Sequence, residues 1–262
     1  MQKLRLATYN ANNVFDRYDD PDKADGPPKS DLSLKAIAKI LSESDADVVS
    51  LQEIENVEML ELLLQSGGLQ TLYPHYKLVE GNDRKGIDVA VISKYPIARF
   101  ESHREKVVGD DHGRPRRFLR DLLEVDVTLP GGGTLRVFSN HYVKQGNRWC
   151  DQQRLAEAQA TARIVRESTS AIPVEHYAVM GDFNDDPDSP TLQALAMFNS
   201  STGLPPSWGI SRPHAEYQPA LFDQILVCNG LRDQWTESGV FQHPAAPQAS
   251  DHQLVWADFL VA

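Results

Sequence analysis

The sequence predicts an α/β (α+β) protein in which most of the mass is strand, sandwiched between helices. Three observations indicate this fold class. Short apolar runs at strand spacing alternate with segments at helical spacing along the chain. The 262 residues are 41% hydrophobic and 24% charged, which is enough apolar material for a sizeable core. No long linker divides the sequence, so we expect one domain over residues 1–262.

Strand patterning begins at the N-terminus. The segment 4–10, LRLATYN, alternates apolar and polar residues, which is the two-residue period of a half-buried strand. The glycine run 131–133 separates two such segments and predicts a hairpin. The full set of expected strands is 4–10, 47–53, 86–93, 121–129, 134–141, 176–184, 222–227 and 253–260.

Helical spacing is found between several of these strands. Leu34, Ile37 and Leu41 recur at the period of one helix face. The pair Ser189-Pro190 is typical of a helix start. We expect helices over 32–41, 57–64, 149–166 and 189–198, and loops rich in Asp, Pro, Gly or Ser over 16–31 and 199–220.

The composition excludes several classes of protein. There are 26 Lys and Arg residues against 37 Asp and Glu residues, a net charge of −11, which disfavours a tight binder of duplex DNA. One segment, 103–120, is basic in this acidic chain. No run approaches the ~18 apolar residues of a membrane span. Two cysteines are too few for a disulfide scaffold or a thiolate metal site.

Acidic, amide and histidine side chains gather where the predicted strands end. Asn10 ends the first strand, Glu53 the second and Asp182 a later one. If the last strand runs antiparallel to these strands, its start lies at the same rim, that is, at the edge of the sheets where the other strands end. We therefore expect one cleft that also receives Asn140, His141, Asn184, Asp251 and His252.

Such a set suits the hydrolysis of phosphate esters. Carboxylate and amide oxygens are preferred ligands of Mg²⁺, Mn²⁺ and Ca²⁺, whereas zinc would require more His or Cys ligands. A bound cation neutralises charge on a phosphate, a carboxylate or imidazole handles protons, and Asn donors stabilise the added negative charge of the transition state.

Six short motifs occur in a characteristic order: TYN (8–10), LQEIEN (51–56), NH (140–141), GDFND (181–185), FDQILV (222–227) and SDH (250–252). In these motifs the sequence resembles the endonuclease/exonuclease/phosphatase superfamily, which includes deoxyribonucleases, abasic-site endonucleases, neutral sphingomyelinases and inositol-polyphosphate phosphatases. The segment 81–97 resembles a bacterial, extracellular-nuclease-like branch. The resemblance implies a four-layer α-β-β-α sandwich with two packed, mostly antiparallel sheets.

The resemblance also implies roles for individual residues. Glu53 matches the metal-binding glutamate, Asn10 the amide that positions the metal site, and Asp251 an aspartate that supports it. The remaining matches concern catalysis: Asp182 orients or deprotonates the attacking water, Asn184 stabilises the pentacovalent phosphate, His252 contacts the scissile phosphate, Asp223 orients His252, and His141 is a candidate general acid. Whether Asp182 or His252 takes the water's proton stays open.

Three further residues are candidate substrate contacts. The run NHYVKQG departs from the family pattern, because Lys144 is shifted by one place and no Ser follows it. Arg117 in the basic segment could supply such a contact instead, although a solvated face is the alternative for that segment. Asp88 lies in the GIDVA pattern and is expected to face the cleft.

The sequence thus favours a Mg²⁺- or Mn²⁺-dependent phosphodiesterase, with Ca²⁺ as a further candidate ion, that acts on nucleic acid by direct attack of water. A phosphatase or phosphodiesterase acting on a small or lipid-derived phosphate is the alternative, and a catalytically dead binding module is a third. We expect a monomer without a membrane span. A cytoplasmic location is expected from the lack of a signal peptide, whereas the resemblance points to secretion.

Overall fold

The computed structural model describes residues 1–18, 22–111, 113–195 and 221–262. In these residues the long strands form a six-stranded and a five-stranded sheet. In order, the first sheet holds β12 (Trp235–Val240), β13 (Val255–Val261), β1 (Gln2–Val14), β2 (Val48–Ile54), β4 (Asp88–Ser93) and β3 (His75–Val79). The second holds β11 (Asp223–Val227), β10 (His176–Asp182), β9 (Thr134–His141), β8 (Leu123–Thr128) and β5 (Ile97–Ser102).

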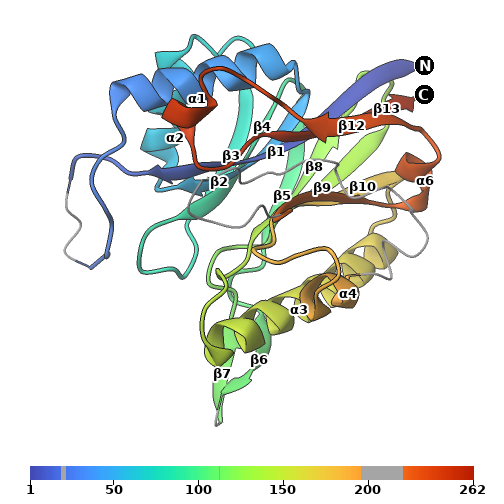
Figure 1. Ribbon diagram of the computed structural model, residues 1–262. Helices are drawn as coiled ribbons and strands as arrows, with labels where there is room; N and C mark the ends of the chain where they lie inside the picture. Colours follow the sequence, from blue (N-terminus) through green and yellow to red (C-terminus); the bar gives the residue numbers. More distant parts are fainter. Residues whose placement is uncertain (19–21, 112, 196–220) are drawn as a thin grey trace.

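The two sheets pack face to face and helices cover their outer faces (Figure 1). On the first sheet lie α1 (Asp31–Ser44) and α2 (Val57–Ser66), and on the second lie α3 (Arg148–Ala171) and α4 (Pro190–Ala194). Short helices α6 (Asn229–Arg232) and α7 (Ala246–Ala249) occupy connections. This is the expected four-layer α-β-β-α sandwich, so the predicted fold class is confirmed.

Each sheet has the same internal arrangement of strand directions. β1 pairs in parallel with β2, and β9 pairs in parallel with β10, while the other described neighbours within the two sheets run antiparallel. β13 runs antiparallel to β1, as the convergence of the polar motifs requires. The ends of β1, β2, β9 and β10 and the starts of β11 and β13 therefore share one rim.

The predicted elements in the sheet interiors and the long helices are observed, and the misses lie at the edges. β3, β12 and β5 were not predicted, and all three are edge strands with half-buried or exposed side chains. Such strands lack the apolar period that identifies an interior strand. The basic segment forms a separate hairpin of β6 (Val107–Asp111) and β7 (Arg114–Arg117). The expected loop 199–220 and the end of the expected helix 189–198 lie outside the described residues.

A buried ionic network fastens the C-terminal half of α3 to the second sheet. Arg136 is fully buried and its guanidinium donates to both carboxylate oxygens of Asp126 and to Ser168 Oγ. Glu124 accepts from Ser168 Oγ at 2.7 Å and lies 2.9 Å from His103 Nε2. Burial alone would raise the pKa of Glu124, but hydrogen bonds from His103, Arg99 and Ser168 outweigh it and lower the pKa to about 2.

Replacing Glu124 by Gln tests how much this network stabilises the fold. A carboxyl whose folded pKa is depressed contributes stability above its unfolded pKa of 4.5 and loses it as the pH falls toward 2. We expect Glu124→Gln to lower the free energy of unfolding by about 3 kcal/mol at pH 7. Urea denaturation followed by circular dichroism measures this difference, with the exposed Glu105→Gln as control. A deficit that stays constant from pH 7 down to pH 3 would contradict the assignment.

Candidate active site

The strand register places three site residues side by side. Asp182, the last residue of β10, pairs with His141 on β9 and with Asp223 on β11. Because β9 and β10 are parallel while β11 is antiparallel, the carboxyl ends of the first two meet the start of the third. The backbone alone therefore sets Asp182 between a histidine and a second aspartate.

Asn10 connects this group to the other sheet. Its side-chain Nδ2 donates to Asp182 Oδ2 at 2.9 Å and to Glu53 Oε1 at 3.2 Å. Its Oδ1 accepts from the backbone N–H of Asn12, which fixes the amide orientation. Asn10 is buried, so these hydrogen bonds are shielded from water. A single amide thus holds a carboxylate from each sheet at the shared rim.

Two of the site residues lie in the left-handed backbone region, which is costly for Glu53 and which Asn184 tolerates better. Glu53 has φ of +63° and Asn184 has φ of +50°. At Glu53 the pairing of β2 with β4 shifts register, and the side chain reaches the N–H of Asn13 through Oε2 at 2.8 Å. At Asn184 the backbone N–H donates to Asp182 Oδ1 at 2.8 Å. Strain of this kind persists where surrounding contacts enforce a functional side-chain position.

His252 and Asp223 form a close buried pair. His252 Nδ1 lies 2.6 Å from Asp223 Oδ2, and the other ring nitrogen, Nε2, lies 3.9 Å from Asp182 Oδ2. Burial would lower the pKa of His252, but the charge and hydrogen bond of Asp223 raise the pKa to about 10. Burial and the charge of Asp223 raise the pKa of Asp182 to about 6. At neutral pH the imidazole is therefore a cation and Asp182 is largely ionised.

His141 has the opposite electrostatic environment. Burial, together with the positive charge of Arg120, holds the pKa of His141 well below its ordinary value. Its Nε2 lies 3.6 Å from Asp182 Oδ2 and 3.8 Å from Glu53 Oε1. These distances exceed those of hydrogen bonds. The two histidines of the site therefore differ in charge at neutral pH.

The donor set fits a hard divalent cation. Glu53 Oε1 and Asp182 Oδ2 approach the same amide nitrogen of Asn10, and His141 Nε2 stands off both oxygens. Asp223 adds a second buried carboxylate with an oxygen within 4.8 Å of an Asp182 oxygen. Oxygen-rich sites with few nitrogens suit Mg²⁺, Mn²⁺ or Ca²⁺.

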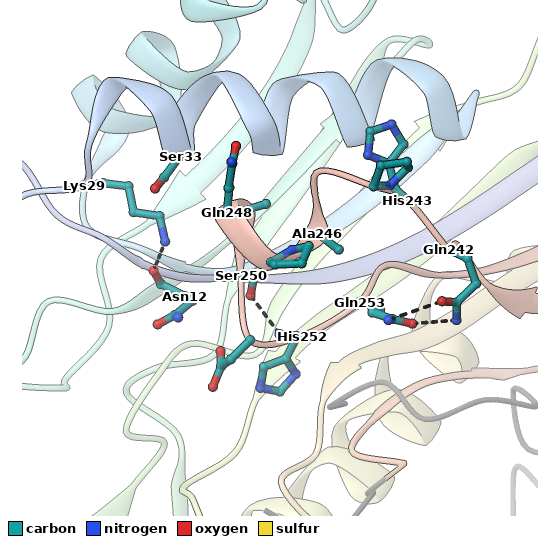
Figure 2. A pocket seen from close by; sticks show the side chains of 14 residues that line it. Asn12, Lys29, Ser33, Gln242, His243, Ala246, Gln248, Ser250, His252 and Gln253 are labelled. Atoms are coloured by element: carbon teal, nitrogen blue, oxygen red, sulfur yellow. Dashed lines mark hydrogen bonds between the residues drawn. The ribbon is translucent and has the colours of Figure 1, made fainter. Parts of the chain in front are cut away.

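A cavity of about 610 Å³ opens beside this cluster. Asp251 and His252 line it together with Asn12 and Lys29, between α1 and the segment that carries α7 (Figure 2). Ser250 Oγ donates to the backbone carbonyl of Asn10 at 2.7 Å, which holds the segment before β13 against β1. Asp251 is half-buried and lines the cavity next to His252.

The three expected substrate contacts occupy different environments. Arg117 is exposed on β7, and its Nε lies 3.2 Å from Glu105 Oε2. Lys144 is exposed in the connection that follows β9. Asp88 is buried at the start of β4, where its Oδ1 accepts from the N–H of Gly81 at 2.7 Å and burial raises its pKa to about 7.

Sequence reasoning missed Arg120, three residues after Arg117. Arg120 is buried, its Nη2 lies 2.8 Å from Asp83 Oδ2, and its Nη1 donates to the carbonyl of Tyr142 at 3.3 Å. Tyr142 follows His141 directly, so this guanidinium lies at the catalytic rim. The segment contains several basic residues, and only their burial in the fold separates Arg120 from the exposed ones.

Comparison with known proteins agrees with this geometry. A model of the Endonuclease/Exonuclease/phosphatase family matches residues 7–252, nearly the whole chain. The match defines the class, that of metal-dependent phosphoester hydrolases. The chain belongs to the endonuclease/exonuclease/phosphatase family, which confirms the resemblance seen in the sequence. A search of curated proteins finds no match.

Solved structures share the fold at low sequence identity. An endonuclease/exonuclease/phosphatase from Bacteroides vulgatus is 16% identical, with a TM-score of 0.68 and 100% of both chains covered. Sphingomyelinase C from Streptomyces griseocarneus is 17% identical, with a TM-score of 0.65 and coverage of 99% of this chain and 100% of that one. Truncated Caenorhabditis elegans TDP2 is 18% identical, with a TM-score of 0.64 and coverage of 99% and 98%.

The described part of the chain holds no helix with the length and apolar character needed to cross a lipid bilayer.

Substituting Asp223→Asn tests the electrostatics of the pair. Without the charge and hydrogen bond of Asp223, only the charges of Asp182 and Asp251 oppose burial, so the pKa of His252 should fall from about 10 toward its ordinary 6.5. Nuclear magnetic resonance of ¹⁵N-labelled histidine in EDTA follows the titration, with the exposed-face variant Lys35→Met as control. An imidazole that stays protonated through pH 8 in the Asp223→Asn protein would show that Asp223 does not set its charge.

Proposed function

We propose that this chain is a Mg²⁺- or Mn²⁺-dependent phosphodiesterase that hydrolyses its substrate by direct attack of water, most readily on nucleic acid. The observation that carries the proposal is the position of Asp182. Asn10 and the N–H of Asn184 hold this carboxylate between His141 and the His252–Asp223 pair, beside Glu53. This arrangement brings a proton acceptor, the positively charged imidazole of His252 and amide donors into one small volume.

In the proposed mechanism Glu53 and Asn10 would hold the metal and Asp251 would support the site. When bound, the cation neutralises charge on the phosphate and on the departing oxygen. Asp182 orients the attacking water and takes its proton, because its carboxylate is ionised above a pKa of about 6. His252 is already protonated at neutral pH, so it donates to a phosphate oxygen and does not act as the base.

The other side chains complete this mechanism. Asn184 donates to the phosphate as negative charge develops on it. Asp223 keeps His252 charged and oriented through their 2.6 Å contact. His141 donates a hydrogen bond to the leaving oxygen; because burial lowers its pKa, it is a neutral imidazole and a weak proton donor. Arg120 contributes positive charge on the side of His141.

Loss of the acceptor or of the imidazolium should abolish turnover. We expect Asp182→Asn and His252→Ala each to lower kcat/KM by about a thousandfold, since a positioned proton-transfer group contributes ~10²–10⁴.

Glu53→Gln should raise the metal concentration required for half-maximal activity, and EDTA should abolish activity in the wild type.

The assay compares supercoiled plasmid, bis-p-nitrophenyl phosphate and p-nitrophenyl phosphate with Mg²⁺, Mn²⁺, Ca²⁺ or EDTA. Circular dichroism verifies that each variant folds, and Lys35→Met is the matched control. Near-normal rates in Asp182→Asn or His252→Ala would refute the site assignment. No turnover of any ester by the wild type would favour a binding module.

A local group of basic side chains favours nucleic acid as the substrate class. The hairpin of β6 and β7 exposes Arg114 and Arg117, and Lys144 and Arg148 are exposed in and after the connection that follows His141. Arg116 Nη2 donates to Gln152 on α3, which joins the hairpin to that helix. Basic side chains of this kind pair with successive phosphates of a strand.

A lipid-derived or small phosphodiester is the second candidate. The overall charge of −11 opposes long contact with a polyanion. The fold is also that of the sphingomyelinase C from Streptomyces griseocarneus, which supports this candidate at the level of the fold.

The hairpin arginines separate the two candidates. Changing Arg114, Arg116 and Arg117 together to Gln should weaken oligonucleotide binding and reduce the slope of log K against log salt by about 0.9 for each duplex phosphate that is no longer neutralised. Hydrolysis of bis-p-nitrophenyl phosphate should be unchanged, because it is too small to reach the hairpin. Fluorescence anisotropy at several salt concentrations measures the slope. An unchanged slope would favour the small phosphodiester.

A further inference from the structure

The cavity beside His252 has a polar lining with one lysine. Figure 2 shows Lys29 and Ser33 on the α1 side and His252 on the opposite side. The other lining groups include the amides of Gln248 and Gln253. Among the described residues that line the cavity there is no Phe, Tyr or Trp; the rings there are the imidazoles of His243 and His252, and Asp251 adds a carboxylate. Its chemistry suits hydroxyls and an anion.

Lys29 is fixed in this cavity by the backbone around it. Its Nζ donates to the carbonyls of Ala11 and Asn12, which leaves the third ammonium proton for another acceptor. Its own N–H donates to the carbonyl of Phe15 at 2.9 Å. These contacts hold a cation at a defined position in a half-buried wall.

Lys29 also lies close to the proposed reaction centre. Its two carbonyl partners belong to residues one and two positions beyond Asn10, which is at most two Cα steps of ~3.8 Å. Burial lowers the pKa of Lys29 to about 8, and the carboxylates of Glu53 and Asp251 act in the opposite direction, so the ammonium is mostly charged at pH 7. A substrate held at Asp182 would therefore place its neighbouring groups within reach of this cation.

We propose that Lys29 forms a second-phosphate subsite, so that the enzyme prefers a phosphodiester carrying another phosphate one linkage from the scissile one. The inference rests on the proposed function. The anion pairs with the ammonium of Lys29, and the amides and hydroxyls of the cavity contact the group between the two phosphates. A nucleic-acid strand and a small bisphosphate ester share this chemistry.

Matched dinucleotides test the subsite. The substrates are dTpdT, with one phosphate, and its 5′- and 3′-phosphorylated forms, pdTpdT and dTpdTp. We expect one added phosphate to raise wild-type kcat/KM by about tenfold, the effect of one charge-assisted hydrogen bond. In Lys29→Met the ratio of kcat/KM with and without the added phosphate should fall to about one. Lys29→Arg should keep part of the wild-type ratio, and the exposed control Lys35→Met should keep all of it.

The ratio distinguishes recognition from structural support. A lysine that only braced Ala11 and Asn12 would lower the rates on all three dinucleotides equally in Lys29→Met, and that result would overturn the proposal. A wild-type ratio near one for both phosphorylated forms would overturn it as well.

Binding separates failure of the subsite from failure of the proposed function. Calorimetry with Mg²⁺ compares thymidine 3′,5′-bisphosphate with thymidine 5′-phosphate on wild type and Lys29→Met. A tenfold loss of affinity in Lys29→Met for the bisphosphate alone supports the subsite even if no dinucleotide is cleaved. Equal affinities of the two proteins for the bisphosphate overturn it. Hydrolysis of p-nitrophenyl esters of glycerol phosphate, with and without a second phosphate, then identifies the source of the second phosphate. If the added phosphate raises the rate only for the nucleotide substrates, the source is a nucleic-acid strand.

Discussion

The amide of Asn10 is the contact on which the rest of the site depends. It donates to a carboxylate from each sheet, Asp182 at 2.9 Å and Glu53 at 3.2 Å, at the rim where the sheets meet. Two carboxylates brought together in a dry environment repel each other and lose their hydration. A neutral donor shared by both keeps them in place while leaving their remaining lone pairs for a cation and a water molecule.

The interior beneath the rim supports this arrangement. Directly under the site, Ser50 on β2 and Ser139 on β9 join the sheets through hydroxyl groups 2.6 Å apart, and Gln52 donates to Ser50. Below them the interface becomes apolar, with Leu6, Val125 and Val137 fully buried. A polar layer over an apolar one thus joins the two sheets beneath the proposed site, where Glu53 adopts a strained backbone conformation.

What the sequence could predict follows from how local each signal is. Asn10, Glu53 and Asp182 end apolar runs, so strand patterning indicated a shared rim for them, and an antiparallel last strand added Asp251 and His252. Arg120 and Lys29 lie in segments that have the composition of a basic face and an acidic loop. Their proximity to the site arises from packing against Tyr142 and Asn12, which no local pattern links to them. Edge strands such as β5 were missed because polar residues, here Arg99 and Glu101, occupy the half-buried positions and Phe100 an exposed one, which removes the apolar period.

The two histidines of the site show how one rim can supply opposite charge states. His252 pairs through Nδ1 with a buried aspartate and is held as a cation, whereas burial and the charge of Arg120 hold His141 neutral. Had both been cations, they would have repelled each other and competed with a metal for Glu53 and Asp182. Had both been neutral, neither histidine could offer a positive charge to a phosphate at Asp182. The asymmetry originates in strand register, because Asp182 separates the aspartate-bearing β11 from the histidine-bearing β9.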